Sequence, residues 1–308
     1  MILSAGLTPA WQQILVFDAF HFGEVNRARE ALWCSSGKVF NAGIGAHHLG
    51  GPSLTLAPVG GPSVPQITAE FRRLGVPYRW IETRAATRVC TTLLDQATGT
   101  ITELVENGRP LTADELDAYL TAYGEQAAVA DVVVLIGSLP EGTPQAYYRQ
   151  LLQRTPCPAV LDFRGDGLLS LLDLQPFLVK PNRGELAQTL GRPLDDDPSL
   201  VAAMRTLNER GAQWVVVTQA AAAVWVTSAQ AVYRLQPPRI RDVVNPIACG
   251  DAMSAALAWA TRAGHPPLDA VRLSLAAAAQ NARQLLPCRL DPHTLESQAA
   301  EVRVERLD

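Results

Sequence analysis

Continuous runs of β-branched residues constrain the fold of this chain more than any other feature. Residues 131–136 read Asp-Val-Val-Val-Leu-Ile, and residues 214–218 read Trp-Val-Val-Val-Thr. Such runs are typical of strands that are buried on both faces of a sheet. Helical patterns alternate with the strands, and we expect helices at residues 112–128, 183–190, 251–262 and 268–283. This alternation predicts an α/β fold in which helices cover both faces of a mostly parallel sheet.

The first third of the chain has a different pattern. Residues 14–17 and 88–94 resemble more exposed strands, and residues 98–100 resemble a hairpin turn that leads into a further strand at 101–104. These segments predict a small second sheet attached to the main one. In an α/β enzyme, such a sheet would cover the carboxyl edge of the main sheet, where ligands bind.

Composition narrows the class of protein. The 308 residues are 48% hydrophobic and carry a net charge of -4, so a sizeable core is expected and a basic surface for nucleic acid is not. No run approaches the roughly 18 apolar residues of a membrane span. The five cysteines are scattered and lack a C-x-x-C pair, which argues against a disulfide framework and against a zinc site. A cytoplasmic protein without nucleic-acid or membrane partners is the simplest interpretation.

The segment 245–251, which leads into an apolar helix, is the strongest candidate for chemistry. Ala248, Cys249 and Gly250 are small, so backbone N–H groups at a helix N-terminus could approach an anion closely. Asp251 could then accept a proton from an attacking hydroxyl. Alternatively, Asp251 merely caps the helix, as Asp often does. The segment alone does not decide between these two interpretations.

Asn182 and Glu185 form a second candidate site at the end of a predicted strand. One helical turn separates them, so their oxygens could hold Mg²⁺ directly or through water. The same Asn-x-x-Glu pattern fits a capping box, and for this pair alone the capping interpretation is favoured.

Four further polar residues lie where they could bind an anion. Lys38 and Asn41 precede an apolar helix, although the spacing is not that of a Walker A loop. Ser138 follows the strand at 131–136, and Arg88 begins a predicted strand of the small sheet. An Arg in such a position can reach a phosphate, but it is more often simply solvated.

Taken in order, these motifs resemble the PfkB family of ATP-dependent carbohydrate kinases, which have the ribokinase-like fold. The resemblance is closest to the branch that contains 1-phosphofructokinase and tagatose-6-phosphate kinase, and it rests on residues 23–27, 87–88, 103–108, 137–140, 180–183, 243–246 and 250–251. It implies a single three-layer α/β domain over residues 1–308. It also implies a small β-sheet lid from about residues 11–35 and 84–108, which in many members forms a homodimer interface.

The resemblance also implies a role for each candidate residue. Asp251 would be the general base, and backbone N–H groups of Ala248, Cys249 and Gly250 would form the anion hole. Asn182 and Glu185 would support Mg²⁺, through water, and the ATP phosphates. The sugar or sugar phosphate would be bound by Gln12, Lys38, Asn41, Arg88 and Ser138. The nucleotide would lie near Thr218, Ala220, Ala223 and Asn281.

Several positions depart from the family pattern. Gln12 stands where an Asp usually binds sugar hydroxyls, and Ile44 stands where close relatives often carry an Arg. The usual Gly-Gly-Lys-Gly has become Ser-Gly-Lys-Val at residues 36–39. Ala220 and Ala223 replace the two glycines of the nucleotide turn, and Ala248 replaces the first glycine before the base. If the nucleotide turn needs positive φ, each alanine there costs on the order of 1 kcal/mol.

Three functions can be compared on this basis. An active phosphotransferase acting on a sugar or sugar phosphate is favoured, because Asp251 is retained together with the Asn182 and Glu185 pair. A kinase-fold binding protein with little or no activity is the alternative, and the lost glycines support it. A nicotinamide-dependent oxidoreductase is poorly supported, because the Gly-x-Gly at residues 43–45 is followed by His48 instead of glycine.

Overall fold

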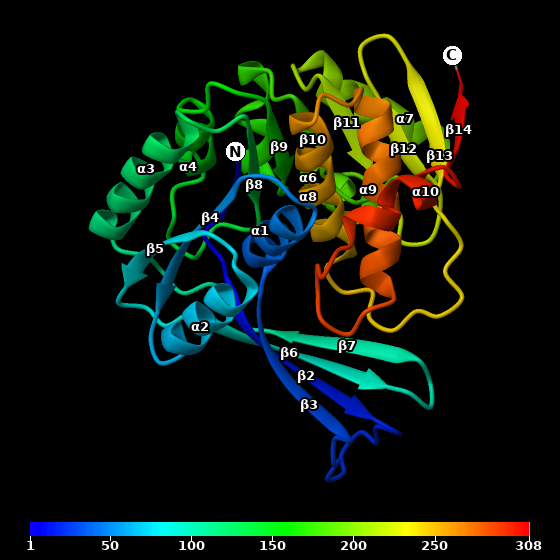
Figure 1. Cartoon of the computed structure of the whole chain (residues 1–308). Helices are drawn as coiled ribbons and strands as arrows, with labels where there is room; N and C mark the ends of the chain where they lie inside the picture. The colour runs from blue at the N-terminus through cyan, green and yellow to red at the C-terminus, as the bar shows by residue number, and fades with distance from the viewer. Residues whose placement is uncertain (308) are drawn as a thin grey trace.

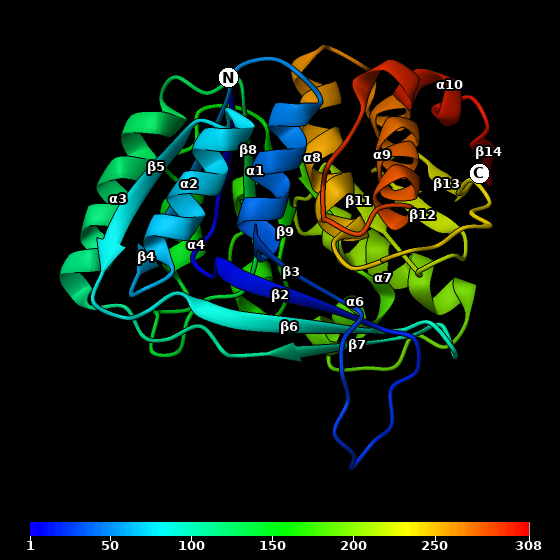
Figure 2. The same cartoon turned by 60° about the horizontal axis from the view of Figure 1, so that its bottom comes forward.

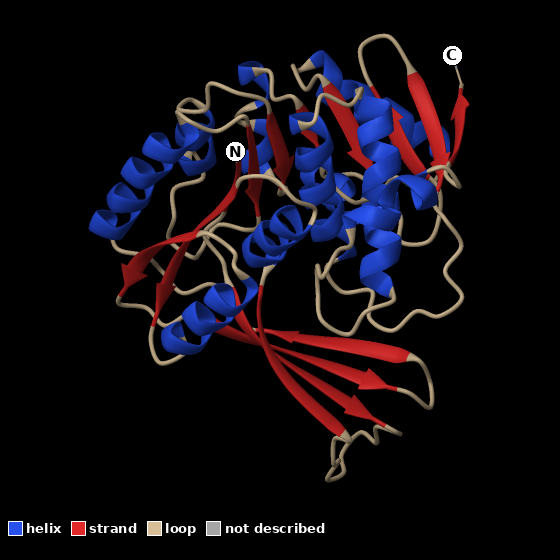
Figure 3. Cartoon of the chain, in the orientation of Figure 1, coloured by secondary structure: helices blue, strands red, loops and turns tan. Residues whose placement is uncertain are grey.

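A computed structural model describes residues 1–307 of the chain, and two sheets organise it (Figures 1 and 3). Within these residues the larger sheet has ten strands. In spatial order they are β14 (Arg303–Arg306), β13 (Val232–Gln236), β12 (Val224–Thr227), β11 (Trp214–Val217), β10 (Leu178–Val179), β9 (Ala159–Asp162), β8 (Val132–Ile136), β1 (Ile2–Ala5), β4 (Ser53–Gly60) and β5 (Tyr78–Thr83). The strands from β11 to β5 are parallel, and β12 to β14 are antiparallel additions at one edge.

Strand β8 illustrates why the sheet is buried on both faces. Its five residues are all buried. Val132, Val134 and Ile136 belong to one hydrophobic cluster, whereas Val133 and Leu135 belong to the other. Because successive side chains of a strand point to opposite faces, an unbroken apolar run supplies both cores.

Helices form a layer on each face of the large sheet, as Figure 3 shows. On one face lie α1 (Lys38–His48), α2 (Val64–Leu74), α8 (Cys249–Arg262), α9 (Pro267–Ala282) and α10 (Leu295–Ala299). On the other lie α3 (Ala113–Ala127), α4 (Tyr147–Leu152), α5 (Asp166–Leu169), α6 (Arg183–Leu190) and α7 (Asp197–Glu209). The short 3-10 helices are η1 (Leu172–Leu174) and η2 (Pro292–Thr294). The predicted three-layer, mostly parallel α/β architecture is confirmed.

The smaller sheet lies across the bottom of the molecule in the view of Figure 1 and comes forward in Figure 2. Its spatial order is β3 (Glu30–Ser36), β2 (Ala10–Phe17), β6 (Arg88–Asp95) and β7 (Thr100–Val105). The predicted turn at residues 98–100 joins β6 to β7 as an antiparallel hairpin. The loop between β2 and β3 projects away from the rest of the chain (Figure 2).

Most predicted helices occur where they were expected, with one instructive shift. Helix α3 begins with the predicted capping box, in which Thr112 and Glu115 bond reciprocally. Helix α8 was predicted to begin at Asp251, which is wrong, because it begins at Cys249 with Ala248 as its N-cap residue. No helix within residues 1–307 combines the length and apolar character that a membrane span needs.

Candidate active site

A cavity of about 630 Å³ lies between the carboxyl edge of the large sheet and the small sheet, and we call it the polar cavity. Parallel sheets present their loops for ligand binding at this edge. The predicted site residues that line the cavity are Gln12, Lys38, Asn41, Arg88, Asn182, Glu185, Thr218, Ala220, Ala248, Cys249, Gly250 and Asp251. Residues from positions 12 to 251 of the chain therefore converge on one space.

Asp251 is the third residue of α8 and is only 6% exposed. It does not cap the helix, because the N-cap is Ala248 and no side chain makes a cap hydrogen bond. Instead its Oδ2 accepts a hydrogen bond of 2.7 Å from Asn41 Nδ2. Burial raises the pKa of Asp251 to about 6, although nearby Lys38 acts in the opposite direction. A carboxylate of raised basicity that lines a cavity is suited to accept a proton near neutral pH.

The turn before α8 is held by hydrogen bonds to α9 and to the loop beyond it. Asn281 Nδ2 donates to Ile247 O at 2.8 Å, and Asn245 Nδ2 donates to Leu285 O at 3.0 Å. Ala248 has a left-handed backbone with φ 69°. The first N–H groups of a helix have no partner within it, so Gly250, which lines the cavity, can present an N–H to an anion.

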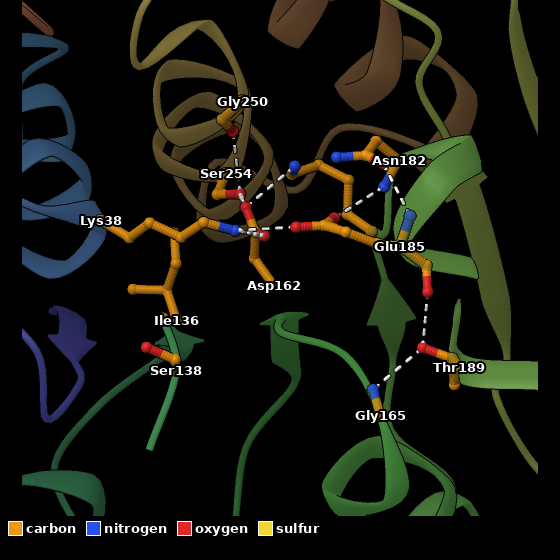
Figure 4. A network of polar contacts seen from close by, with 12 residues as sticks. Lys38, Ile136, Ser138, Asp162, Gly165, Asn182, Glu185, Thr189, Gly250 and Ser254 are labelled. Carbon is orange, nitrogen blue, oxygen red and sulfur yellow. Dashed lines mark hydrogen bonds and ion pairs between the residues drawn. The ribbon is translucent and has the colours of Figure 1, made fainter. Parts of the chain in front are cut away.

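Asp162, which sequence reasoning missed, is the centre of a charged cluster beside the polar cavity (Figure 4). Its Oδ1 lies 2.8 Å from Lys38 Nζ, and its Oδ2 lies 2.9 Å from Lys180 Nζ and accepts from Ser254 Oγ at 2.8 Å. Asp162 is 1% exposed, and burial alone would raise its pKa. The two lysines outweigh burial and hold the pKa of this carboxyl well below its usual range.

A usable sequence signal existed for Asp162 and Lys180. Asp162 is the last residue of β9, and Lys180 directly follows β10, the next parallel strand of the sheet. Because parallel strands end at one edge, polar residues at neighbouring strand ends are expected to meet. Burial also opposes the charge on Lys38, yet Asp162, Glu185 and Asp251 raise its pKa above the ordinary value.

Asn182 and Glu185 form the capping box that their spacing allowed. Asn182 Oδ1 accepts from Glu185 N at 2.8 Å, and Glu185 Oε2 accepts from Asn182 N at 2.9 Å. The other carboxylate oxygen, Glu185 Oε1, lies 3.5 Å from Lys38 Nζ (Figure 4). Glu185 therefore stabilises the start of α6 and also belongs to the charged wall of the polar cavity.

The small sheet supplies the opposite wall of the polar cavity. Gln12 is buried and donates from Nε2 to Thr92 Oγ1. Arg88 donates from Nε to Pro9 O, from Nη1 to Glu106 O and from Nη2 to Thr8 O, at 3.1 to 3.3 Å. Arg88 thus joins three backbone segments where the sheet meets the cavity, in addition to lining it.

A second cavity of about 640 Å³, which we call the apolar cavity, adjoins the first. Thr218, Ala220 and Gly250 line both. Its other walls are largely apolar and include Val224, Ile240, Val243, Met253 and Leu275. Ala220 has φ 49°, so both turns that separate the cavities contain an alanine in the left-handed region. The sheet edge therefore offers one charged and one apolar space that meet at the start of α8.

Three predicted contact residues lie outside both cavities. Ser138 is exposed, and its Oγ is 3.5 Å from Thr8 Oγ1. Ala223 accepts a hydrogen bond from Gln219 Nε2 within the turn. Asn281 is fully buried and holds Ile247, so it supports the turn from beneath instead of facing a ligand. The structure does not bring these three residues to the lining of the site.

A layered α/β chain with a buried carboxylate near a helix N-terminus, in a charged cavity that an apolar cavity adjoins, has the architecture of a phosphotransferase. The sequence profile of the pfkB family carbohydrate kinases matches residues 8–292, so the chain belongs to this family. It is an ATP-dependent carbohydrate kinase, and the predicted family resemblance is confirmed.

Solved structures share the fold along the whole chain. A protein described as a possible 1-phosphofructokinase from Thermotoga maritima is 22% identical, with 100% of this chain and 99% of that chain covered and a TM-score of 0.89. Phosphofructokinase-2 from Escherichia coli in complex with fructose-6-phosphate is 22% identical, with 97% of each chain covered and a TM-score of 0.84. Its tetrameric inhibited form is 21% identical, with coverage of 97% and 98% and a TM-score of 0.86.

Proposed function

We propose that this kinase transfers the terminal phosphoryl group of ATP to a hydroxyl of a sugar phosphate. The observation that carries the proposal is Asp251, a buried carboxylate in the polar cavity whose pKa is raised to about 6 and whose neighbour Gly250 lines both cavities. Escherichia coli phosphofructokinase-2, which has this fold, was solved with fructose-6-phosphate. That likeness makes hexose phosphates the first acceptors to test.

In the proposed reaction, Asp251 accepts the proton of the acceptor hydroxyl as the hydroxyl oxygen bonds to phosphorus. The bond between that phosphorus and the ADP oxygen breaks, and ADP leaves. The anion hole of Ala248, Cys249 and Gly250 would stabilise the phosphoryl oxygens. Because Cys249 N already donates to Pro246 O at 3.3 Å, Gly250 is the better donor of the two. Asn41, bonded to Asp251, would orient the carboxylate.

The apolar cavity is suited to the base of ATP, and its junction at Thr218 and Ala220 is suited to the chain of phosphates. Lys38 and Lys180, which both pair with Asp162, would neutralise part of the negative charge of the phosphates.

Magnesium fits this wall of the polar cavity. Within residues 1–307 no group of three or more His, Cys, Asp or Glu is placed to hold a metal. Mg²⁺ commonly keeps several waters and binds one or two carboxylates plus substrate phosphates, so Glu185 with Asn182 suffices as the protein's share. When bound, the ion would neutralise charge that develops on the phosphates.

We also propose that the small sheet is a lid and that its outer face forms a homodimer interface. Trp11 and Trp33 stack on this face with ring centroids 5.9 Å apart. Trp33 is 46% exposed and Leu104 on β7 is 55% exposed, which is unusual for large apolar side chains. Light scattering should give a dimer for the parent and a monomer for Trp33→Glu. A monomeric parent at micromolar concentration would contradict this assignment.

The kinase proposal is tested by ATP consumption over a panel of hexoses, hexose phosphates and nucleosides. The parent should turn over at least one hexose phosphate, and Asp251→Asn should lose at least about a hundredfold in rate. Absence of turnover across the panel, with sugar-phosphate binding intact by calorimetry, would instead identify a binding protein.

A further inference from the structure

Glu103 on β7 is a carboxylate that lines the polar cavity and has no role in the chemistry proposed above. It lies on the wall formed by the small sheet, across from the charged cluster of the large sheet. A cavity carboxylate without a role is worth explaining, because carboxylates in ligand sites usually orient a ligand or set its charge.

Every other carboxylate that lines this cavity already has a protein partner. Asp162 pairs with Lys38 and Lys180, Glu185 pairs with Lys38 and caps α6, and Asp251 accepts from Asn41. Glu103, by contrast, makes no side-chain hydrogen bond or ion pair among the described residues. Its two oxygens are therefore available to a ligand.

The neighbours of Glu103 form a polar row across the sheet. Thr92 on β6 lies directly opposite Glu103 in the register, and Gln12 on β2 donates to Thr92. Nε2 donates one of its two hydrogens to Thr92, and Oε1 of the Gln12 amide makes no hydrogen bond to a described residue. Glu103 and Oε1 of Gln12 thus offer acceptors to a ligand, and the hydroxyls of a sugar can donate to them.

Electrostatics disfavour a phosphate beside Glu103. Burial raises the pKa of Glu103, and the nearby Arg88 opposes that rise. Arg88 cannot give its full donor set to a phosphate there, because Nε, Nη1 and Nη2 each donate to a backbone carbonyl. A phosphate against β7 would lie beside a second acidic group, whereas a neutral polyol can donate hydroxyl hydrogens to that group.

We infer that Glu103 is a specificity-determining residue that accepts hydrogen bonds from hydroxyl groups of the acceptor sugar, so that the hydroxyl-bearing side of the acceptor lies against β7 and any phosphate lies away from it. The inference rests on the proposed function for the identity of the ligand. It names the substrate class more closely: an acceptor with at least one free hydroxyl besides the one that is phosphorylated.

The test compares Glu103→Gln with the parent on the best acceptor from the panel. Glu30→Gln is the matched control, because it removes one exposed carboxylate from the same sheet outside the cavity. Loss of a charged hydrogen bond should raise the KM for the acceptor about ten- to a hundredfold in Glu103→Gln. The KM for ATP should stay within about twofold, and Glu30→Gln should match the parent.

Deoxy analogues of the acceptor separate direct contact from a structural effect. If Glu103 touches a hydroxyl, removing that hydroxyl weakens binding to the parent. The same deoxy analogue should then bind Glu103→Gln as well as the full acceptor does. An unchanged acceptor KM in Glu103→Gln, or equal losses for every deoxy analogue in both proteins, would overturn the inference.

Calorimetry keeps this inference separate from the kinase proposal. If the parent turns over nothing but binds a sugar phosphate, the proposed function fails, and weaker binding by Glu103→Gln would still support the role of Glu103. If binding is equal in the two proteins, the role of Glu103 fails whether or not turnover occurs. Tighter binding of a sugar phosphate by Glu103→Gln would show that the phosphate lies at β7 and would also overturn the inference.

Discussion

The two walls of the polar cavity differ in how completely their carboxylates are bonded. On the large-sheet wall, Asp162 has three side-chain partners, and Asp251 is bonded to Asn41. On the small-sheet wall, Arg88 and Gln12 are hydrogen-bonded, but Glu103 has no bonded partner among the described residues. The carboxylates of the large-sheet wall are satisfied by protein partners, whereas Glu103 on the small-sheet wall is available to a ligand.

This difference suggests a division of labour. Groups that take part in phosphoryl transfer need fixed geometry, and a bonded network supplies it before the substrate arrives. Groups that select the acceptor gain from being unbonded, because the ligand then makes the missing hydrogen bonds. We therefore expect substitutions on the large-sheet wall to change the rate or the stability, and substitutions on the small-sheet wall to change the affinity for the acceptor.

The largest effect is expected for Asp251→Asn. Removal of the general base should lower kcat by about a hundred- to ten-thousandfold. Stability should not fall, because the raised pKa of Asp251 means that burying the charged form opposes folding at pH 7. Steady-state kinetics and urea unfolding measure the two effects. Activity close to that of the parent would remove Asp251 from the mechanism.

Asp162→Asn should affect stability most among the charged positions. It leaves Lys180, which is buried, without its anionic partner. Breaking a buried pair in this way should lower the free energy of unfolding by about 3 kcal/mol. Asp173→Asn is the control, since Asp173 pairs with Arg149 at the surface and its loss should matter far less. Equal effects of the two substitutions would mean that the cluster is not a structural centre.

The pH dependence tests the same wall without a substitution. Because the base must be ionised and the pKa of Asp251 is about 6, kcat/KM should fall about tenfold per unit below pH 6 and level off above it. The stability contribution has the opposite sign. Since the folded pKa lies above the ordinary value of 3.8, this group stabilises the fold below about pH 4, and that contribution is lost as pH rises through 6. A rate that is flat from pH 5 to 8 would exclude Asp251 as the titrating base.

Sequence patterns predicted the strands and the capping box of the large-sheet wall. They did not predict the contacts between residues that are distant in the chain. The strand at 132–136 followed from its β-branched run, and the Asn182 capping box followed from its spacing. The bond between Asn41 and Asp251 joins residues 210 positions apart, which no local pattern contains. Asn281 was assigned to the nucleotide because the family resemblance gives only the position of a residue along the chain. Its burial beneath the turn depends on the packing of α9 against α8, which the resemblance does not give.

The smallest expected effect concerns the left-handed alanines at the junction of the cavities. Ala248 has φ 69°, which costs an L-residue roughly 1–2 kcal/mol relative to glycine. Ala248→Gly relieves that strain, while the more flexible unfolded chain offsets about 0.4–1 kcal/mol of the gain. The free energy of unfolding should therefore stay level or rise by up to about 1 kcal/mol. Ala202→Gly, on an exposed position within α7, should instead lose about 1 kcal/mol. Equal losses in the two variants would mean that the left-handed backbone of Ala248 carries no strain.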